Sequence, residues 1–537
     1  MGKKGFFKKT AAMAAAGTML VSCTGTAWAG AFADTMKAEL EKETTAIVEE
    51  WDESLNELDG SKVGNVDLTV NLADTGRSMI TMLGGLDVSW LKRLGIKMDF
   101  ALAEGKEQAI LDLYANEQTL ATMLMDIDLA GELVKAMIPE LSSSAITAPM
   151  TFEADGFEDS EQFMRVYMDI LRDPKAVLPD GNTVKELYDR YGSIIFDHME
   201  DGESGEAVVS AGGIEENATV VEGILDTPGA IALSKDILAT AKEDEQIAQI
   251  VKNLETAAPD LSGLYDKMQS GIDDVLKEID EEGDPEEDVT VSSKTYTNAD
   301  GKNIGAESTV FEDGAEVMTI ICKYPSDGDQ TGLEFSISAD GETYGIEGTG
   351  TITDDIVNGE YQFMANGVAM ASATVENLDV KAGNSGTITL KLIENMPDED
   401  TYSAIGSIVI TITLAGEGKN NGSVEIEVSY AGSSLGSIRL AAAKGEGTVD
   451  VSALDAAANV YDTENDEDMA AFAGEINPEA ILDNLTAAGA PEGFAESLIS
   501  LFEGGGDDYV DYDYDDDYDY DYDYDDAEET AATDAAA

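Results

Sequence analysis

Hydrophobic and polar positions alternate in two long stretches of the chain. In the first stretch the alternation covers four short runs: residues 66–72, 96–102, 109–114 and 119–129. In the second, from about 289 to 440, the period stays at two; Ile388, Leu390 and Leu392, for example, are separated by polar residues. Such alternation buries one face of a strand and leaves the other in water, which is typical of antiparallel sheets. We expect roughly nine or ten strands in the second stretch.

Residue pairs that favour tight turns separate the expected strands of the second stretch. They are Asp300-Gly301, Asp340-Gly341, Asn358-Gly359, Asn366-Gly367 and Asn421-Gly422. Asn or Asp followed by Gly readily adopts the positive φ angles of a two-residue hairpin loop. Strands do not alternate with helices here, so a doubly wound parallel sheet is disfavoured.

Helical periodicity predicts a first helix over 34–58 and a block of helices in the middle of the chain. The block is expected over 159–171, 183–199, 247–254 and 264–279, and a shorter helical region over 466–502. Thr183-x-x-Glu186 has the form of a capping box at the start of the second of these helices. The predicted fold class is therefore α+β: a long, curved antiparallel sheet (a half-barrel-like meander), a central helical block and a disordered acidic C-terminal tail.

Composition divides the chain into six expected segments. They are a signal peptide (1–29), an α+β region (30–280), an acidic linker (281–288), a β meander (289–445), a short helical region (446–503) and a tail (504–537). The linker has no apolar residue and contains both Gly and Pro. Residues 507–526 comprise twelve Asp, seven Tyr and Val510, and closely spaced like charges keep such a segment extended.

The first thirty residues have the features of an export signal. Four lysines precede an apolar run over residues 10–22, which is too short to span a membrane. Two processing sites are open. Leu20-Val21-Ser22-Cys23 resembles a lipobox, which would end the signal at Ser22 and lipidate Cys23; Ala27-Trp28-Ala29 would release a soluble protein that begins at Gly30. We expect an extracellular or cell-surface protein, with a lipid at Cys23 as its only membrane attachment.

Charge and composition exclude several kinds of function. The chain of 537 residues has 110 acidic and 31 basic residues, a formal net charge of −79, and a single His. Nucleic acid is excluded as a partner, because phosphate recognition needs clustered Lys and Arg. One His and two Cys leave no imidazole- or thiol-based catalytic set, and we expect a non-enzymatic protein without a cofactor.

Two sequence features that suggest catalysis have simpler structural interpretations. Gly432-Ser433-Ser434-Leu435-Gly436 matches the G-x-S-x-G nucleophile elbow, but an alternating strand follows it where the elbow needs a helix. A hairpin turn explains the match. His198 continues an apolar helical stripe, and we expect it to be a packed residue bonded to a nearby carboxylate or carbonyl.

Carboxylates offer the remaining candidate chemistry. Asp462, Glu464 and Asp466 have loop-like spacing for a divalent cation, but Glu467 stands where an EF-hand requires Gly. These three are the metal candidates, and the Asp/Tyr tail is a second region for loose cation binding. Two alternatives therefore stay open: a carboxylate-based polysaccharide hydrolase, and a cation-responsive surface protein that acts through its tail.

The pattern of Val63–Leu129 and Val289–Leu440 resembles the LolA-like family of exported bacterial carriers. In that family a curved, incomplete barrel lies over helices and shelters a lipid moiety. The chain is also similar to large lipoproteins of Gram-positive bacteria. The likeness lies in the order of elements and assigns no site residue. Alternation on one face, together with the absence of an imidazole- or thiol-based catalytic set, leads us to expect a non-enzymatic cell-envelope binding or scaffold protein whose apolar sheet face packs on the helices or shelters a hydrophobic ligand.

Overall fold

A computed structural model describes residues 32–495 apart from several short gaps. The gaps are 60–61, 85–86, 104–105, 129–130, 132, 151–169, 171–172, 259–260, 283–287, 382–384, 393–407, 417–420 and 446–447. The chain forms two compact units, Met1–Ala490 and Pro491–Ala537, and the fold below is that of the first unit. Most of the helix predicted over 159–171, the signal region and the Asp/Tyr tail lie outside the described residues.

The described residues contain nine α-helices and one short 3₁₀ helix. They are α2 (Phe32–Asp59), α3 (Asp74–Gly84), α5 (Pro174–Val177), α6 (Gly181–Asp197), α7 (Thr227–Glu243), α8 (Glu245–Ala257), α9 (Leu264–Glu282), η3 (Ser452–Leu454), α11 (Asp466–Glu475) and α12 (Glu479–Ala487). The helices predicted over 34–58, 183–199, 247–254 and 264–279 correspond to α2, α6, α8 and α9. No helix in this part of the chain is both long and apolar enough to cross a membrane.

Aspartate side chains cap the N-termini of three helices of the central block. Asp180 accepts the backbone N–H of Thr183 at the start of α6, Asp226 caps α7, and Asp244 caps α8. An N-cap carboxylate satisfies backbone donors that have no partner within the helix. The capping box predicted at Thr183 is therefore wrong, because Asp180 is the capping residue.

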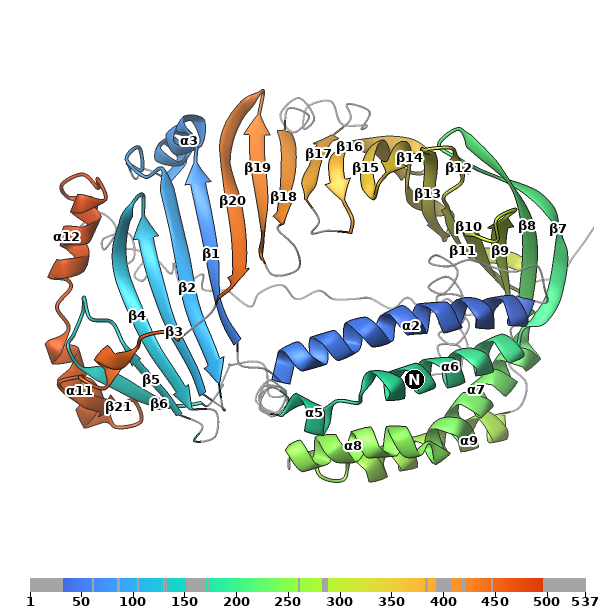
Figure 1. The fold of residues 1–537 in the computed structure, drawn as a ribbon, viewed down its shortest axis with the longest axis horizontal. Coiled ribbons are helices and arrows are strands. Elements are labelled where there is room, and N and C mark those ends of the chain that lie inside the picture. Colours follow the sequence, from blue (N-terminus) through green and yellow to red (C-terminus); the bar gives the residue numbers. More distant parts are fainter. Residues whose placement is uncertain are drawn as a thin grey trace, which may run out of the picture. The chain divides into compact units, whose positions relative to one another are not determined.

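Twenty-one strands of the described residues form one sheet. The first eight are β1 (Lys62–Leu72), β2 (Arg93–Ala103), β3 (Lys106–Ala115), β4 (Gln118–Asp128), β5 (Leu133–Met137), β6 (Ala145–Pro149), β7 (Glu200–Ala211) and β8 (Ile214–Leu225). The others are β9 (Val289–Asn298), β10 (Asn303–Glu312), β11 (Ala315–Lys323), β12 (Ser326–Asp327), β13 (Gln330–Ala339), β14 (Glu342–Thr353), β15 (Ile356–Ala365), β16 (Val368–Asp379), β17 (Gly386–Leu392), β18 (Ile408–Gly416), β19 (Asn421–Tyr430), β20 (Ser433–Lys444) and β21 (Val460–Asp462). The predicted α+β fold with a long, curved antiparallel sheet is confirmed (Figure 1).

Two meanders join to make this sheet. Strands β7 to β20 follow one another across it, and β1 to β6 continue from β20 because β1 pairs with both β20 and β2. Leu68 of β1 lies opposite Leu440 on one side and Ile96 on the other. The pairs are antiparallel except for β6 with β21. The two alternating stretches of sequence therefore form neighbouring parts of one sheet.

Several turns lie where the sequence predicts them, and two do not. Asp340-Gly341 and Asn366-Gly367 have the paired positive φ angles of a tight hairpin turn. Asn358-Gly359 and Asn421-Gly422 instead lie inside β15 and β19, so those two predictions are wrong. At Gly359 an added Cβ would lie 2.7 Å from the Tyr361 hydroxyl, so the glycine makes room for a ring.

The main hydrophobic core lies between the helical block and one face of the sheet. Phe32 and Met36 of α2 and Phe196 of α6 pack with Val291 of β9 and Val310 of β10. We call the face that carries Val291 and Val310 the inner face. Figure 1 shows the sheet curving around the side on which α2 lies.

The C-terminal part of the unit packs on the opposite face, at the other end of the sheet. Leu124 of β4 packs with Val451 and Leu454 near η3, and Leu120 packs with Ala488 after α12. Leu124 lies opposite Ile110 of β3. The next residue, Leu111, lies opposite Met98 of β2, on the face that continues from strand to strand to Val310, so Ile110 and Leu124 lie on the other face. The two ends of the sheet are thus covered on opposite faces.

Candidate functional site

Cross-strand pairing extends the inner face as an apolar surface across the sheet. Residues that lie directly opposite each other in neighbouring strands point to the same face. The successive inner-face pairs are Val310–Met318, Ile320–Ile337, Phe335–Ile346, Ile346–Phe363, Tyr361–Ala373, Ala373–Leu390, Leu390–Ile410, Ile412–Ile426, Ile426–Ile438, Ile438–Val70 and Val70–Leu94. The face that forms the core at β9 and β10 therefore stays apolar as far as β2.

This surface is covered at β9 and β10 and again at β16, where Ala373 is 6% exposed, and it is exposed in two stretches, β13 to β15 and β19 through β20 and β1 to β2. Val291 beneath the helices is 1% exposed, whereas Ile438 of β20 is 52% exposed and Leu440 47%. We call the exposed part the apolar band; its members include Leu68, Leu94, Ile96, Phe335, Ile337, Tyr344, Phe363, Val424, Ile426, Ile438 and Leu440. Exposed apolar patches of this kind commonly mark a binding surface.

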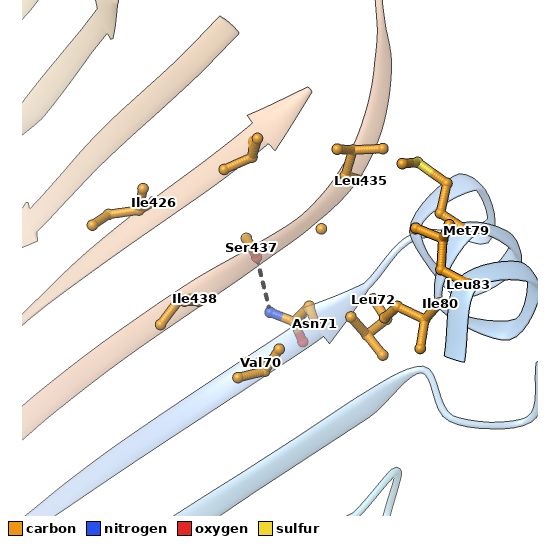
Figure 2. A pocket seen from close by; sticks show the side chains of 13 residues that line it. Val70, Asn71, Leu72, Met79, Ile80, Leu83, Ile426, Leu435, Ser437 and Ile438 are labelled. Atoms are coloured by element: carbon orange, nitrogen blue, oxygen red, sulfur yellow. Dashed lines mark hydrogen bonds between the residues drawn. The ribbon is translucent and has the colours of Figure 1, made fainter. Parts of the chain in front are cut away.

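Helix α3 turns part of the apolar band into a groove with a volume of about 600 Å³. Figure 2 shows Met79, Ile80 and Leu83 of α3 on one side, with Val70, Ile426 and Ile438 of the strands on the other. The remaining lining residues are Asn71, Leu72, Gly76, Val428, Leu435, Gly436 and Ser437. We call this cavity the α3 groove.

Backbone contacts hold α3 against the sheet. The N–H of Ala73 donates to the carbonyl of Leu435 at 3.1 Å. A Cβ at Gly76 would lie 1.9 Å from the same oxygen, so only glycine permits this approach. Arg77 donates to the Leu72 carbonyl and pairs with Asp74, which ties the first turn of the helix to the end of β1.

Sequence reasoning missed α3 and therefore missed the groove. The available signal was the cluster of Met79, Ile80 and Leu83 after Asp74, which gives an 11-residue helix one apolar side. These residues lie between two predicted strands, and their partners on β19 and β20 are more than 340 positions away in the sequence. Local periodicity carries no information about that pairing.

Asn71 and Ser437 are the two lining residues with polar side chains, and both side chains are hydrogen-bonded. Asn71 donates to the Ser437 hydroxyl at 3.1 Å, and Ser437 donates to a Glu425 carboxylate oxygen at 2.6 Å. None of the thirteen lining residues is charged. The arrangement therefore offers mainly apolar contact area, as ligand pockets commonly do.

No family model matches the chain, and no curated protein matches it. A solved structure described as "Asymmetric conductivity of engineered proteins" aligns with 72% of this chain and 99% of its own. The TM-score is 0.22 and the identity 8%, a likeness too low to carry an argument.

The three metal candidates do not converge on one point. Asp462 accepts the backbone N–H of Glu464, and Asp468 accepts that of Asp462. Asn465 caps α11, whose first residue is Asp466. Within the described residues, no group of three or more His, Cys, Asp or Glu side chains is placed to hold a metal ion. The acidic residues whose spacing suggested a cation loop instead form turns and lie next to a helix cap.

The lipidation candidate, Cys23, lies outside the described residues.

The G-x-S-x-G segment forms a hairpin, as the sequence indicates. Ala431 and Gly432 both have positive φ and connect β19 to β20. Strand β20 follows where a nucleophile elbow would have a helix. Ser434 therefore lies in a sheet.

A polar cluster on the face opposite the apolar band is also structural. The Tyr114 hydroxyl lies 2.7 Å from Asp67 and from Thr69, and the Arg93 guanidinium stacks over the ring. Burial, and then the hydrogen bond to Asp67, raises the pKa of Tyr114. The tyrosine therefore stays a neutral donor within its network.

His198 connects two helices of the central block. Its Nδ1 lies 2.8 Å from the carbonyl of Ile194 in α6, and its Nε2 lies 3.0 Å from a carboxylate oxygen of Asp236 in α7. We expect His198→Ala to lower the free energy of unfolding by about 1–2 kcal/mol, because both interactions are lost. Chemical denaturation would measure this, with Asp236→Asn as a milder variant. An unchanged midpoint for His198→Ala would show that the imidazole does not link the helices.

Proposed function

We propose that this protein is an exported, non-enzymatic binding protein that shelters a hydrophobic ligand on the inner face of its sheet, with the α3 groove as the principal site. The observation that carries the proposal is the exposed apolar band, which narrows into an uncharged groove of about 600 Å³. Ligand pockets typically have about 300–1,000 Å³ and a mainly apolar lining.

The distribution of polarity supports a binding role over a packing role. The helical block already covers the inner face at β9 and β10, where the core residues are almost fully buried. The band lies further along the same face, and its side chains remain 36–55% exposed. Each apolar side chain that an occupant covers gains about 25 cal/mol per Å² removed from water.

The first test measures binding of an uncharged, environment-sensitive dye such as Nile red to the full exported chain. We expect the dye to bind, and the double variant Ile80→Gln/Leu83→Gln to weaken binding about 10- to 100-fold, because two apolar contacts are lost. Ile80 is 41% exposed and Leu83 76%, so the change places no polar group in a core.

Leu482→Gln provides the matched control. Leu482 is an exposed leucine on α12, 37% accessible and outside the groove. Dye binding by this variant should equal that of the wild type. Equal binding by the double variant and the wild type, or no binding by delipidated wild type, would contradict the proposal. Native mass spectrometry of the purified protein would show whether a ligand is retained from the cell.

A further inference from the structure

The volume of the α3 groove matches that of one chain. One water molecule occupies about 30 Å³ in the liquid, and we take the same volume for each heavy atom of a ligand. A groove of about 600 Å³ then holds on the order of 20 heavy atoms. That corresponds to one long alkyl chain with a small head group. A second long chain would lie outside this volume.

The four elements that form the groove differ in charge from the rest of the protein. Strands β1, β19 and β20 and helix α3 together hold four acidic residues (Asp67, Asp74, Glu425, Glu427) and four basic residues (Lys62, Arg77, Arg439, Lys444). The whole chain has 110 acidic and 31 basic residues. The groove is therefore built from a charge-balanced region within a strongly acidic protein.

An anionic head group finds no cation in this groove. Arg77, the basic residue of α3, already pairs with Asp74 and donates to the Leu72 carbonyl. Outside the groove, the net charge of −79 produces a potential that repels anions. A bound carboxylate would thus meet an unfavourable field without a compensating ion pair.

A cationic head group also lacks a partner inside the groove. No carboxylate lines the groove. The Glu425 carboxylate, which is hydrogen-bonded to the lining residue Ser437, already accepts that hydroxyl. Cations will associate with acidic surface throughout the protein, and that association does not select the groove. Charge complementarity at the groove itself favours a head group without charge.

We infer that the α3 groove takes an electrically neutral, single-chain lipid. The inference rests on the proposed function and adds the chemical class of the ligand. Two consequences follow. Affinity should rise about fourfold per methylene within a series of n-alkyl alcohols until the groove is filled. It should not depend on ionic strength.

The test displaces Nile red with three amphiphiles of equal chain length: dodecanol below its solubility limit, and dodecanoate and dodecyltrimethylammonium below their micellar concentrations. Displacement is measured on the wild type and on Ile80→Gln/Leu83→Gln, and the difference defines groove binding. We expect groove binding of dodecanol to be on the order of tenfold tighter than that of dodecanoate. Raising the ionic strength from about 0.01 M to about 1 M, which shortens the Debye length tenfold, should strengthen dodecanoate binding and leave dodecanol unchanged.

The outcomes separate this inference from the proposed function. If dodecanoate or dodecyltrimethylammonium occupies the groove as tightly as dodecanol, the neutral-ligand inference is overturned while the groove remains a binding site. If none of the three displaces the dye in a groove-dependent way, the proposed function itself fails. Tighter dodecanol binding that disappears in the double variant supports both.

Discussion

Replacing Asp244 with alanine is expected to lower the free energy of unfolding by about 3 kcal/mol, because it removes a helix cap together with the buried carboxylate of a partly exposed ion pair. The Asp244 side chain is 1% exposed and lies where α7 ends and α8 begins. One carboxylate oxygen accepts the backbone N–H groups of Gln246 and Ile247 at 2.9 and 3.3 Å. The other pairs with Arg190 and accepts the Tyr191 hydroxyl, both on α6.

The same group makes stability depend on pH. Burial acts to raise the pKa of Asp244, but the Arg190 guanidinium, the two backbone N–H groups and Tyr191 outweigh it, so the pKa is lowered from its usual 3.8. A depressed pKa gives stability that is fully present above the unfolded value and is lost as the pH falls through the folded value. The difference between wild type and Asp244→Ala should therefore be constant at neutral pH and shrink below about pH 4.

The contact between Tyr191 and Asp244 also makes stability depend on pH in alkaline solution. Burial and the neighbouring Asp244 carboxylate raise the pKa of Tyr191 to about 12. Its contribution is present below the usual value of 10 and is lost as the pH rises towards 12. In Asp244→Ala this alkaline loss should diminish, because the second cause of the shift is absent.

Asp226→Ala is the matched control for Asp244. Asp226 also caps a helix, accepting the N–H of Gly229 at 2.8 Å, but it is exposed and forms no ion pair with the described residues. Its loss should lower the free energy of unfolding by about 1 kcal/mol. Urea denaturation over a range of pH measures both variants. If the two cost the same, the pairing with Arg190 contributes nothing to stability.

Sequence reasoning succeeded where the structure is periodic over a long run. Helix α2 and strands β2 to β4 present regular apolar positions, and twelve strands occur over the stretch for which nine or ten were expected. It failed at the β7–β8 hairpin, which lies in a region interpreted as helical. Most of β7 is exposed and carries acids such as Glu203 and Glu206, so no one-sided pattern marks it.

The candidate site depends on information that alternation does not contain. The pairing of Val70 with Ile438 brings together residues from opposite ends of the chain, and it decides which strands α3 can cover. The alternating positions of the strands do predict a sheet with one apolar face, and the expectation of a hydrophobic ligand rests on that face. Whether helices cover the apolar face follows from tertiary packing, which leaves Ile438 half exposed and Val291 buried.

The packing of α2 on β8 makes a second large effect testable. A Cβ added at Gly223 would lie 2.3 Å from the Phe32 ring, which is itself 1% exposed. Such a contact forces the ring or the helix to move. We expect Gly223→Ala to cost about 3 kcal/mol of unfolding free energy, and Phe32→Ala about 4 kcal/mol from the cavity that it leaves.

The double variant identifies the contact itself. In Gly223→Ala/Phe32→Ala the new methyl group enters space that the ring has left, so the combined loss should fall short of the sum by at least about 1 kcal/mol. Gly205→Ala is the control, because its added Cβ meets no atom within 4 Å. That change should stay within about 0.5 kcal/mol of the wild type. Strict additivity of the two core substitutions would mean that α2 does not lie on β8 at Gly223. In that case α2 would not cover the inner face in the way described above.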